Sequence, residues 1–126
     1  EADLVSISSA IENDIVRKVC GMRMCWLGLS EVMGTGHGAT PQADQQWIWN
    51  DGTTATDYTN WKQWGAASGP AGAAYNEPNN WVADSPMSGD ERKAFINYPL
   101  AGAKGYWYDT VPTMPAFAIC EKAMTL

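Results

Sequence analysis

Apolar residues near the start of the chain recur with the period of a helix. They form one stripe with a spacing of four residues: Ile11, Ile15 and Val19. Ser9 and Glu12 have the spacing in which two side chains cap each other's backbone N–H groups at the start of a helix. Gly21 follows the last apolar position and is typical of a helix end. The pattern therefore predicts a short helix over residues 10–20.

The rest of the chain has shorter apolar runs separated by Gly, Pro and polar residues, which is typical of β-strands. The runs that we predict to be strands are residues 4–7, 25–29, 46–49, 93–98, 106–109 and 116–122. Residues 62–90 show no convincing period, and a stretch of this length without regular elements is commonly functional. One helix, five or six short strands and one long loop indicate an α+β fold.

Length and composition limit the classes of protein to consider. The chain has 126 residues, which favours a single domain over residues 1–126. With 45% hydrophobic and 17% charged residues, it is too apolar for a disordered chain, and polar residues interrupt it too often for a membrane span. The net charge of −6 argues against nucleic acid as a partner, because no positive field would attract phosphates.

The three cysteines are compatible with a secreted domain that contains a disulfide, although the odd number leaves one without a partner in this sequence. Cys20 and Cys25 enclose a short loop, so we expect them to pair, with Cys120 free or bonded to a residue outside the sequence. The alternative is three buried, reduced thiols. The chain begins at Glu1 with no Met and no signal-peptide pattern, so we expect a processed or excised piece of an extracellular, secretory-pathway or cell-surface protein.

Carboxylate and amide oxygens are concentrated at Glu77-Pro78-Asn79. Proline fixes its own φ and permits a cis bond at low cost, so both flanking side chains could be aimed in one direction, and we expect the Glu77–Pro78 bond to be cis. Calcium takes six to eight such oxygens, and Glu91 and Asp109 could complete the shell if folding brings them near. Taken alone, the same three residues would form an ordinary exposed turn.

Seven motifs occur in the order that C-type lectin domains show. They are Leu4-Val5-Ser6-Ile7 with Glu12, Cys25-Trp26-Leu27-Gly28-Leu29, Trp47-Ile48-Trp49 with Asp51-Gly52, Tyr58-Thr59-Asn60-Trp61, Glu77-Pro78-Asn79-Asn80, Gly105-Tyr106-Trp107-Tyr108-Asp109 and Ile119-Cys120-Glu121. The chain therefore resembles a C-type lectin domain over nearly its whole length. The family's first helix, which holds the cysteine that bonds to the Cys120 position, has no counterpart here, and the resemblance implies an N-terminally incomplete domain.

The resemblance also implies a calcium site that binds two adjacent sugar hydroxyls. The ligands that match the family are Glu77, Asn79, Glu91 and Asp109. The Glu-Pro-Asn motif goes with mannose, glucose, GlcNAc or fucose in this family, so the implied partner is a glycan or a glycoprotein. Tyr108 stands where the family has an Asn, and a phenol does not replace a carboxamide as a calcium ligand. The alternative is thus a lectin-like protein-interaction or structural subunit that has lost sugar binding.

Several further residues have both a functional and a structural interpretation. Ser6, Glu12 and Glu121 match a second calcium site that some members of the family have, whereas Glu12 could serve only as a helix cap. Trp81 follows the Glu-Pro-Asn motif and either stacks on a sugar or packs within the loop. Four other tryptophans lie in strand or motif patterns and are predicted to be core: Trp26, Trp47, Trp49 and Trp61.

An enzymatic function has little support in the sequence. Its one His lies in a Gly-rich stretch, and no nucleophile with an oriented base can be recognised. Asp90 and Glu91 are adjacent on a predicted extended segment, so their side chains would point to opposite faces and could not flank one glycosidic bond. We therefore expect a binding protein and no catalysis.

Overall fold

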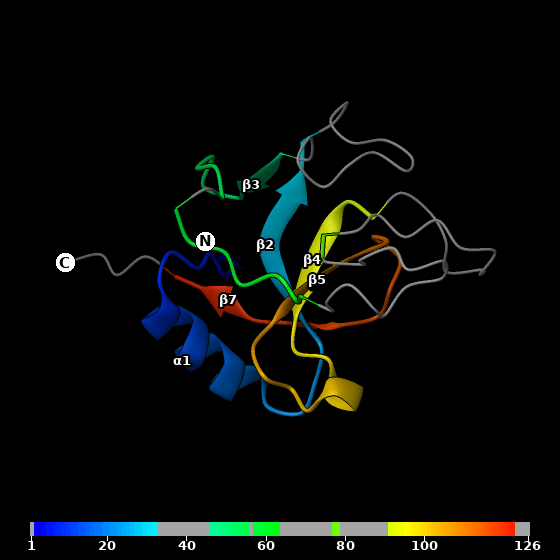
Figure 1. Cartoon of the computed structure of the whole chain (residues 1–126). Coiled ribbons are helices and arrows are strands. Elements are labelled where there is room, and N and C mark those ends of the chain that lie inside the picture. Colours follow the sequence, from blue (N-terminus) through cyan, green and yellow to red (C-terminus); the bar gives the residue numbers. More distant parts are fainter. Residues whose placement is uncertain (1, 33–45, 56, 64–76, 79–90, 123–126) are drawn as a thin grey trace.

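The computed structural model describes residues 2–32, 46–55, 57–63, 77–78 and 91–122. In this part of the chain it has one α-helix, α1 (Ala10–Cys20), one short 3-10 helix, η3 (Pro99–Ala101), and two sheets of short strands. The α+β expectation is confirmed (Figure 1). Neither of these helices is long and apolar enough to cross a membrane.

The larger sheet has five strands and is built around β2 (Cys25–Glu31). Its other members are β3 (Trp47–Trp49), β4 (Lys93–Ile96), β5 (Trp107–Thr110) and β6 (Phe117–Ala118). The strand order is β3-β2-β4-β5 with antiparallel neighbours, and β6 runs parallel beside β2. The smaller sheet pairs β1 (Asp3–Leu4) with β7 (Cys120–Glu121) in antiparallel register.

Most predicted strands are present but shorter than expected, because the chain changes partners within them. The predicted strand 4–7 pairs with β7 only as far as Leu4, and at Val5 the carbonyl already accepts from Gly28 of β2. The predicted strand 116–122 divides into β6, on β2, and β7, on β1. The predicted strand 93–98 ends at Ile96, because Asn97 has a φ of 66°, outside the extended region.

The predicted helix is confirmed as α1. The Oγ of Ser9 accepts a hydrogen bond from the backbone N–H of Glu12 (3.2 Å), and the N–H of Gly21 closes the other end on the carbonyl of Arg17 (3.0 Å). The Glu12 carboxylate accepts from Ser8, at its backbone N–H (2.7 Å) and its Oγ (2.8 Å), instead of from Ser9. The capping pattern thus predicted both ends of the helix correctly. The one difference is that the Glu12 carboxylate binds Ser8 and not Ser9.

The apolar stripe of α1 faces outward. Ile11, Ile15 and Val19 are 76%, 56% and 67% exposed. The helix face that packs onto the rest of the molecule carries a different set of residues: Asn13, Val16 and Cys20. The most regular apolar spacing in the sequence therefore marks an exposed surface of the described structure.

Buried side chains from α1, β2, β3, β4 and β5 form the core, together with Val5 and Ile7. It contains Leu27, Leu29, Ile96 and Trp107, each at most 1% exposed. Trp47, Trp49 and Trp61 pack around Trp107 or one another, with ring centroids 4.9 to 5.7 Å apart, although Trp61 keeps partial exposure. Trp26 is only partly buried and lies outside this core, so the prediction was wrong for that residue; its neighbours Cys25 and Leu27 point inward instead.

Cys20 and Cys25 form a disulfide, as predicted from their spacing. The bond joins the last residue of α1 to the first residue of β2. The alternative of three reduced thiols is therefore wrong. Cys120 is an exposed free cysteine on β7.

Candidate functional site

A ladder of backbone hydrogen bonds places Glu77 beside β5. The N–H of Glu77 donates to the carbonyl of Lys62 (2.8 Å), and the N–H of Lys62 donates to the carbonyl of Trp107 (3.0 Å). The N–H of Trp107 in turn donates to the carbonyl of Asn60 (2.9 Å). The segment around Lys62 therefore lies between Glu77 and β5, although Glu77 and β5 are far apart in the sequence.

Buried amide side chains hold the start of β5 against α1. Asn13 accepts from the indole N–H of Trp107 (2.7 Å) and donates to the carbonyl of Gly105 (3.1 Å), which also accepts from Asn60 (2.8 Å). Asn97, which is fully buried, accepts from the N–H of Gly105 (2.8 Å) and donates to carbonyls at the end of α1. Sequence reasoning missed Asn13 and Asn97. The only signal for Asn13 was its position opposite the apolar stripe.

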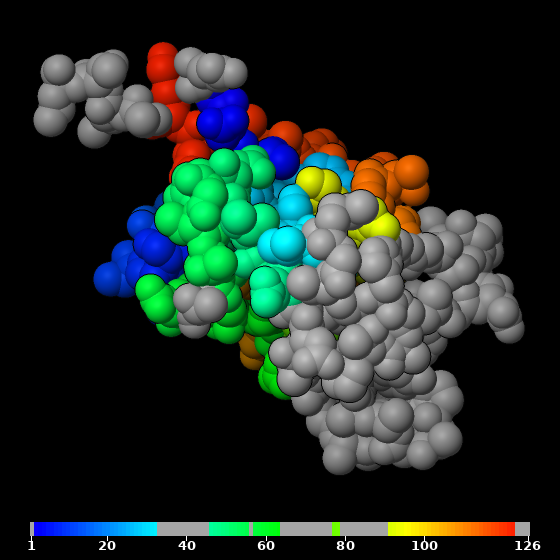
Figure 2. Space-filling model, turned by 90° about the horizontal axis from the view of Figure 1, so that it is seen from above, coloured from blue at the N-terminus to red at the C-terminus, as the bar shows by residue number. Residues whose placement is uncertain are grey.

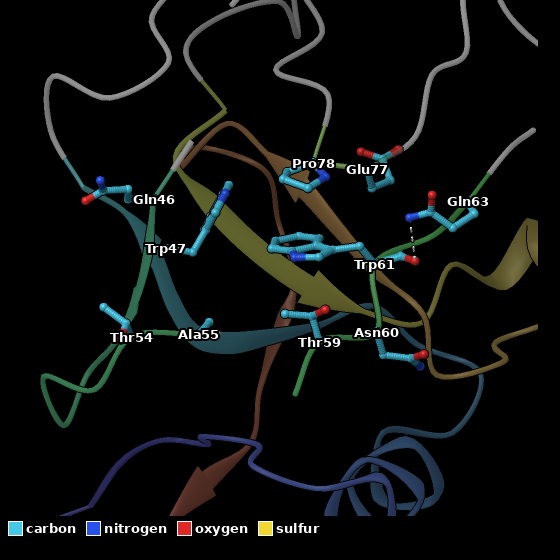
Figure 3. Close-up of a pocket in the computed structure, with 10 residues that line it drawn as sticks. All are labelled: Gln46, Trp47, Thr54, Ala55, Thr59, Asn60, Trp61, Gln63, Glu77 and Pro78. Atoms are coloured by element: carbon cyan, nitrogen blue, oxygen red, sulfur yellow. Dashed lines mark hydrogen bonds between the residues drawn. The ribbon is translucent and has the colours of Figure 1, made fainter. Parts of the chain in front are cut away.

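Glu77 lies at the edge of a cleft of about 710 Å³. The Glu77–Pro78 bond is cis, as the sequence predicted, and both residues are buried. The cleft is lined by Gln46, Trp47, Thr54, Ala55, Thr59, Asn60, Trp61, Gln63, Glu77 and Pro78. Figure 3 shows Pro78 and Glu77 on one side of the Trp61 ring, with Trp47 and Gln46 across from Glu77. Residues 46–55 and 57–63 also form much of the described surface in Figure 2, between α1 and the end of β2.

Tyr108 packs on the face of β5 opposite to Trp107. Its ring stacks on Phe95 with centroids 5.1 Å apart and contacts Tyr98 at 5.7 Å. Burial raises the pKa of the Tyr108 phenol to about 12, and the negative charge of Glu77 adds to the same effect. Trp107 itself points inward and is fully buried. The influence of Glu77 on the pKa places its carboxylate in electrostatic range of Tyr108.

Of the other predicted calcium ligands, Asp109 and Glu91 lie within the described residues. Asp109 is 5% exposed and lies opposite Ala94 of β4, and Glu91 is partly buried just before β4 begins. Asn79 and Trp81 lie outside the described residues. Within the described ranges, no group of three or more His, Cys, Asp or Glu side chains is placed to hold a metal ion.

The residues of the predicted second calcium site have structural contacts of their own. The Glu12 carboxylate accepts two hydrogen bonds from Ser8 at the start of α1, which lower the pKa of this exposed group. Glu121 is exposed on β7 opposite Asp3. Ser6 has a buried Oγ with no hydrogen-bond partner in the described structure. The interpretation of Glu12 as part of the helix start therefore has direct support, whereas the second site stays a prediction.

Comparisons with known proteins agree with the architecture. The family model described as the lectin C-type domain matches residues 1–122. Human C-type lectin domain family 10 member A is 29% identical over 124 residues, which are 98% of this chain. The chain spans only 30% of the length of that protein.

Solved structures show the same fold. The carbohydrate-recognition domain of the mouse scavenger receptor C-type lectin is 27% identical and superimposes with a TM-score of 0.61, covering 99% of this chain and 72% of that one. The C-type carbohydrate-recognition domain of cow CD23, solved in the presence of a GlcNAc2Man3 oligosaccharide, has a TM-score of 0.64 with the same coverage. Its identity of 24% shows a shared fold only.

Proposed function

This chain belongs to the C-type lectin domain family, and from that premise we propose that it is a calcium-dependent module that binds sugars of the mannose, glucose, GlcNAc and fucose type. The proposed calcium ligands are Glu77, Asn79, Glu91 and Asp109. Members of this family bind carbohydrates and are not enzymes. The proposed partners are glycans or glycoproteins, and the proposed location is extracellular or at the cell surface.

The observation that carries the proposal is the connection of Glu77 to β5 through Lys62. Backbone hydrogen bonds join Glu77 to Lys62 and Lys62 to Trp107 of this strand, and the Glu77 charge acts on Tyr108. Asp109 is the next residue of β5 and is also buried. Only one segment therefore separates these two oxygen-bearing residues from distant parts of the sequence, which supports a shared cation site.

The donor types fit a hard cation. C-type lectin domains generally bind calcium, and carboxylate and amide oxygens are the ligands that calcium prefers. When bound, calcium would supply coordination positions for two adjacent sugar hydroxyls. In this proposal the Glu77 carboxylate accepts hydrogen bonds from the same hydroxyls, the Asn79 amide accepts or donates them, and Trp81 contributes a stacking surface.

The cleft beside Glu77 has the mixed character that sugars need. The ring of Trp61 provides an apolar face, and exposed Thr59 and Gln63 provide hydrogen-bonding groups around it. Binding of a single sugar at such an open site would be weak, so useful binding would come from several domains acting together.

Tyr108 supports a second candidate function, a lectin-like protein-interaction or structural subunit that has lost sugar binding. The phenol replaces the carboxamide that the family places at this position, and it stacks on Phe95. Tyr108→Asn is expected to create or strengthen sugar binding if the site has decayed. A large loss of sugar binding in this variant would contradict decay and give Tyr108 a direct part in the site.

The test is a calorimetric titration with calcium, followed by methyl mannoside. We expect saturable calcium binding, and heat on adding the sugar only when calcium is present. Glu77→Gln should abolish both signals, because it removes a charged ligand but retains the size of the side chain. Asp3→Asn is the matched control, since it removes one exposed charge on β1 and should leave both signals unchanged.

Two results would contradict the proposal. Calcium binding that persists in Glu77→Gln would place the ion elsewhere. A protein that folds but shows no calcium heat would favour the protein-interaction alternative.

A further inference from the structure

The outward face of α1 is an apolar strip in the described structure. Four large exposed hydrophobic side chains of the described structure lie on this helix or in the turn after it: Ile11, Ile15, Val19 and Met22. The first three follow each other at intervals of four residues, so they form a line along the helix axis. Burial of Val16 and Cys20 on the opposite face shows that this line takes no part in the core. Large apolar side chains gathered on one exposed face are typical of an interaction surface.

One side of the strip carries a pair of opposite charges. Asp14 forms salt bridges with Lys18 (2.6 Å) and with Arg17 (2.6 Å). Asp14 and Lys18 keep 46% and 65% of their side chains exposed, so both can also reach a neighbouring molecule. On a helix these two residues flank the strip on the same side, with the acid nearer to the N-terminus.

We propose that this strip binds a second copy of the chain through an antiparallel pair of α1 helices. In a two-fold pair centred on Ile15, the residue meets its own copy, and Ile11 meets the partner's Val19. The same rotation brings Asp14 next to the partner's Lys18, because residues on one flank face the same flank of the antiparallel partner. Apolar spacing and charge are therefore self-complementary in this arrangement, and the helix dipoles oppose each other favourably.

The interface is small, so the pair is weak. Stable complexes bury roughly 800 Å² per partner, and a strip of three residues on an 11-residue helix provides less. The chain is therefore a monomer when dilute and a dimer when concentrated or tethered close to another copy. None of the strip residues lines the cleft beside Glu77, so pairing through the outer face of α1 uses no residue of that cleft.

Sedimentation equilibrium of the chain from about 10 µM to about 1 mM tests the proposal, since weak interfaces associate in this range. The expected result is a reversible monomer–dimer equilibrium. Ile15→Lys should weaken association by about tenfold or more, because it places two like charges at the two-fold axis. Leu100→Lys is the matched control: Leu100 is 87% exposed in η3, and its substitution should not change association.

Two further experiments test the direction of pairing. In a Cys120→Ser background, Ile15→Cys chains should form covalent dimers under mild oxidation much faster than Leu100→Cys chains. Asp14→Lys and Lys18→Asp should each weaken association, and the double exchange should restore it, because unlike charges then face each other again.

A monomer at every concentration, or equal cross-linking of the two cysteine variants, would overturn the proposal. So would a loss of folding stability in Ile15→Lys without any change in association, because the strip would then pack within one chain. None of these results depends on sugar or calcium binding.

Discussion

Asn13 is buried in the inner face of α1, and both ends of its amide are used. Its oxygen accepts from the Trp107 indole and its nitrogen donates to the Gly105 carbonyl, so one side chain connects the helix to the start of β5. A buried amide of this kind is stabilising only while all of its partners remain satisfied.

Asn13→Ala should lower the free energy of unfolding by about 1 to 3 kcal/mol, because the buried Trp107 N–H loses its acceptor. Urea denaturation would measure the change. Lys18→Ala is the control on the same helix: its exposed ion pair should contribute no more than about 1 kcal/mol. Equal effects of the two substitutions would contradict the structural role given to Asn13.

Tyr108 provides a test of the electrostatic effect of Glu77 on β5. The folded-state pKa of its phenol is about 12 against an ordinary value of 10.0, so the folded protein holds this proton more tightly than the unfolded chain does. The stabilisation is complete below pH 10 and is lost as the pH rises towards 12.

Ultraviolet titration should therefore show a tyrosine that ionises near pH 12, and Tyr108→Phe should remove this step. Glu77→Gln should lower the pKa of the Tyr108 phenol, because the variant lacks the nearby negative charge. Burial should still keep this pKa above 10. An unchanged pKa in Glu77→Gln would mean that the two side chains are not neighbours in solution.

At the scale of elements, signals confined to a few residues predicted structure well. The caps and spacing around Ser9 and Gly21 gave the bounds of α1, and the spacing of Cys20 and Cys25 gave the disulfide. Strand ends were less predictable, because they depend on where distant strands change partners, as at Val5. The outward direction of the Ile11 stripe was not predictable for the same reason: periodicity defines a face but does not say what the face meets.

The disulfide connects the last residue of α1 to the first residue of β2. Replacing both Cys20 and Cys25 by Ser should lower the free energy of unfolding by about 2 kcal/mol, as expected for a short closed loop. Guanidinium denaturation would measure the loss. Cys120→Ser, which removes an exposed free thiol, should leave stability nearly unchanged. A larger effect from Cys120→Ser would show that β7 contributes more than the disulfide.

At the scale of the whole molecule, the candidate site could be predicted only through the family resemblance. The motif Glu77-Pro78 identified an oxygen-rich segment, but nothing in its spacing showed that Lys62 would connect it to Trp107. That contact depends on the complete fold, as does the burial of Asp109 and the stacking of Tyr108 on Phe95.

The proposed calcium site should couple to stability, because an ion bound only by the folded state stabilises it. Calcium at about 100 times its dissociation constant should raise the free energy of unfolding by about 2.7 kcal/mol. Urea denaturation with calcium, with magnesium and with a chelator would measure this. Magnesium should have little effect because it requires a smaller, more regular shell. Identical curves in all three conditions would contradict the proposed site.

The pairing of β1 with β7 has a mechanical consequence. Asp3 lies opposite Glu121 and Leu4 opposite Cys120, so the strands lead away from their ladder at the same end. A pulling force applied through both strands would load their hydrogen bonds one after another and open this ribbon like a zipper at low tension. The five-stranded sheet, which holds Glu77 through Lys62 and Trp107, would bear load only after the ribbon had opened. The two-stranded ribbon is thus the part of the domain that yields first under tension.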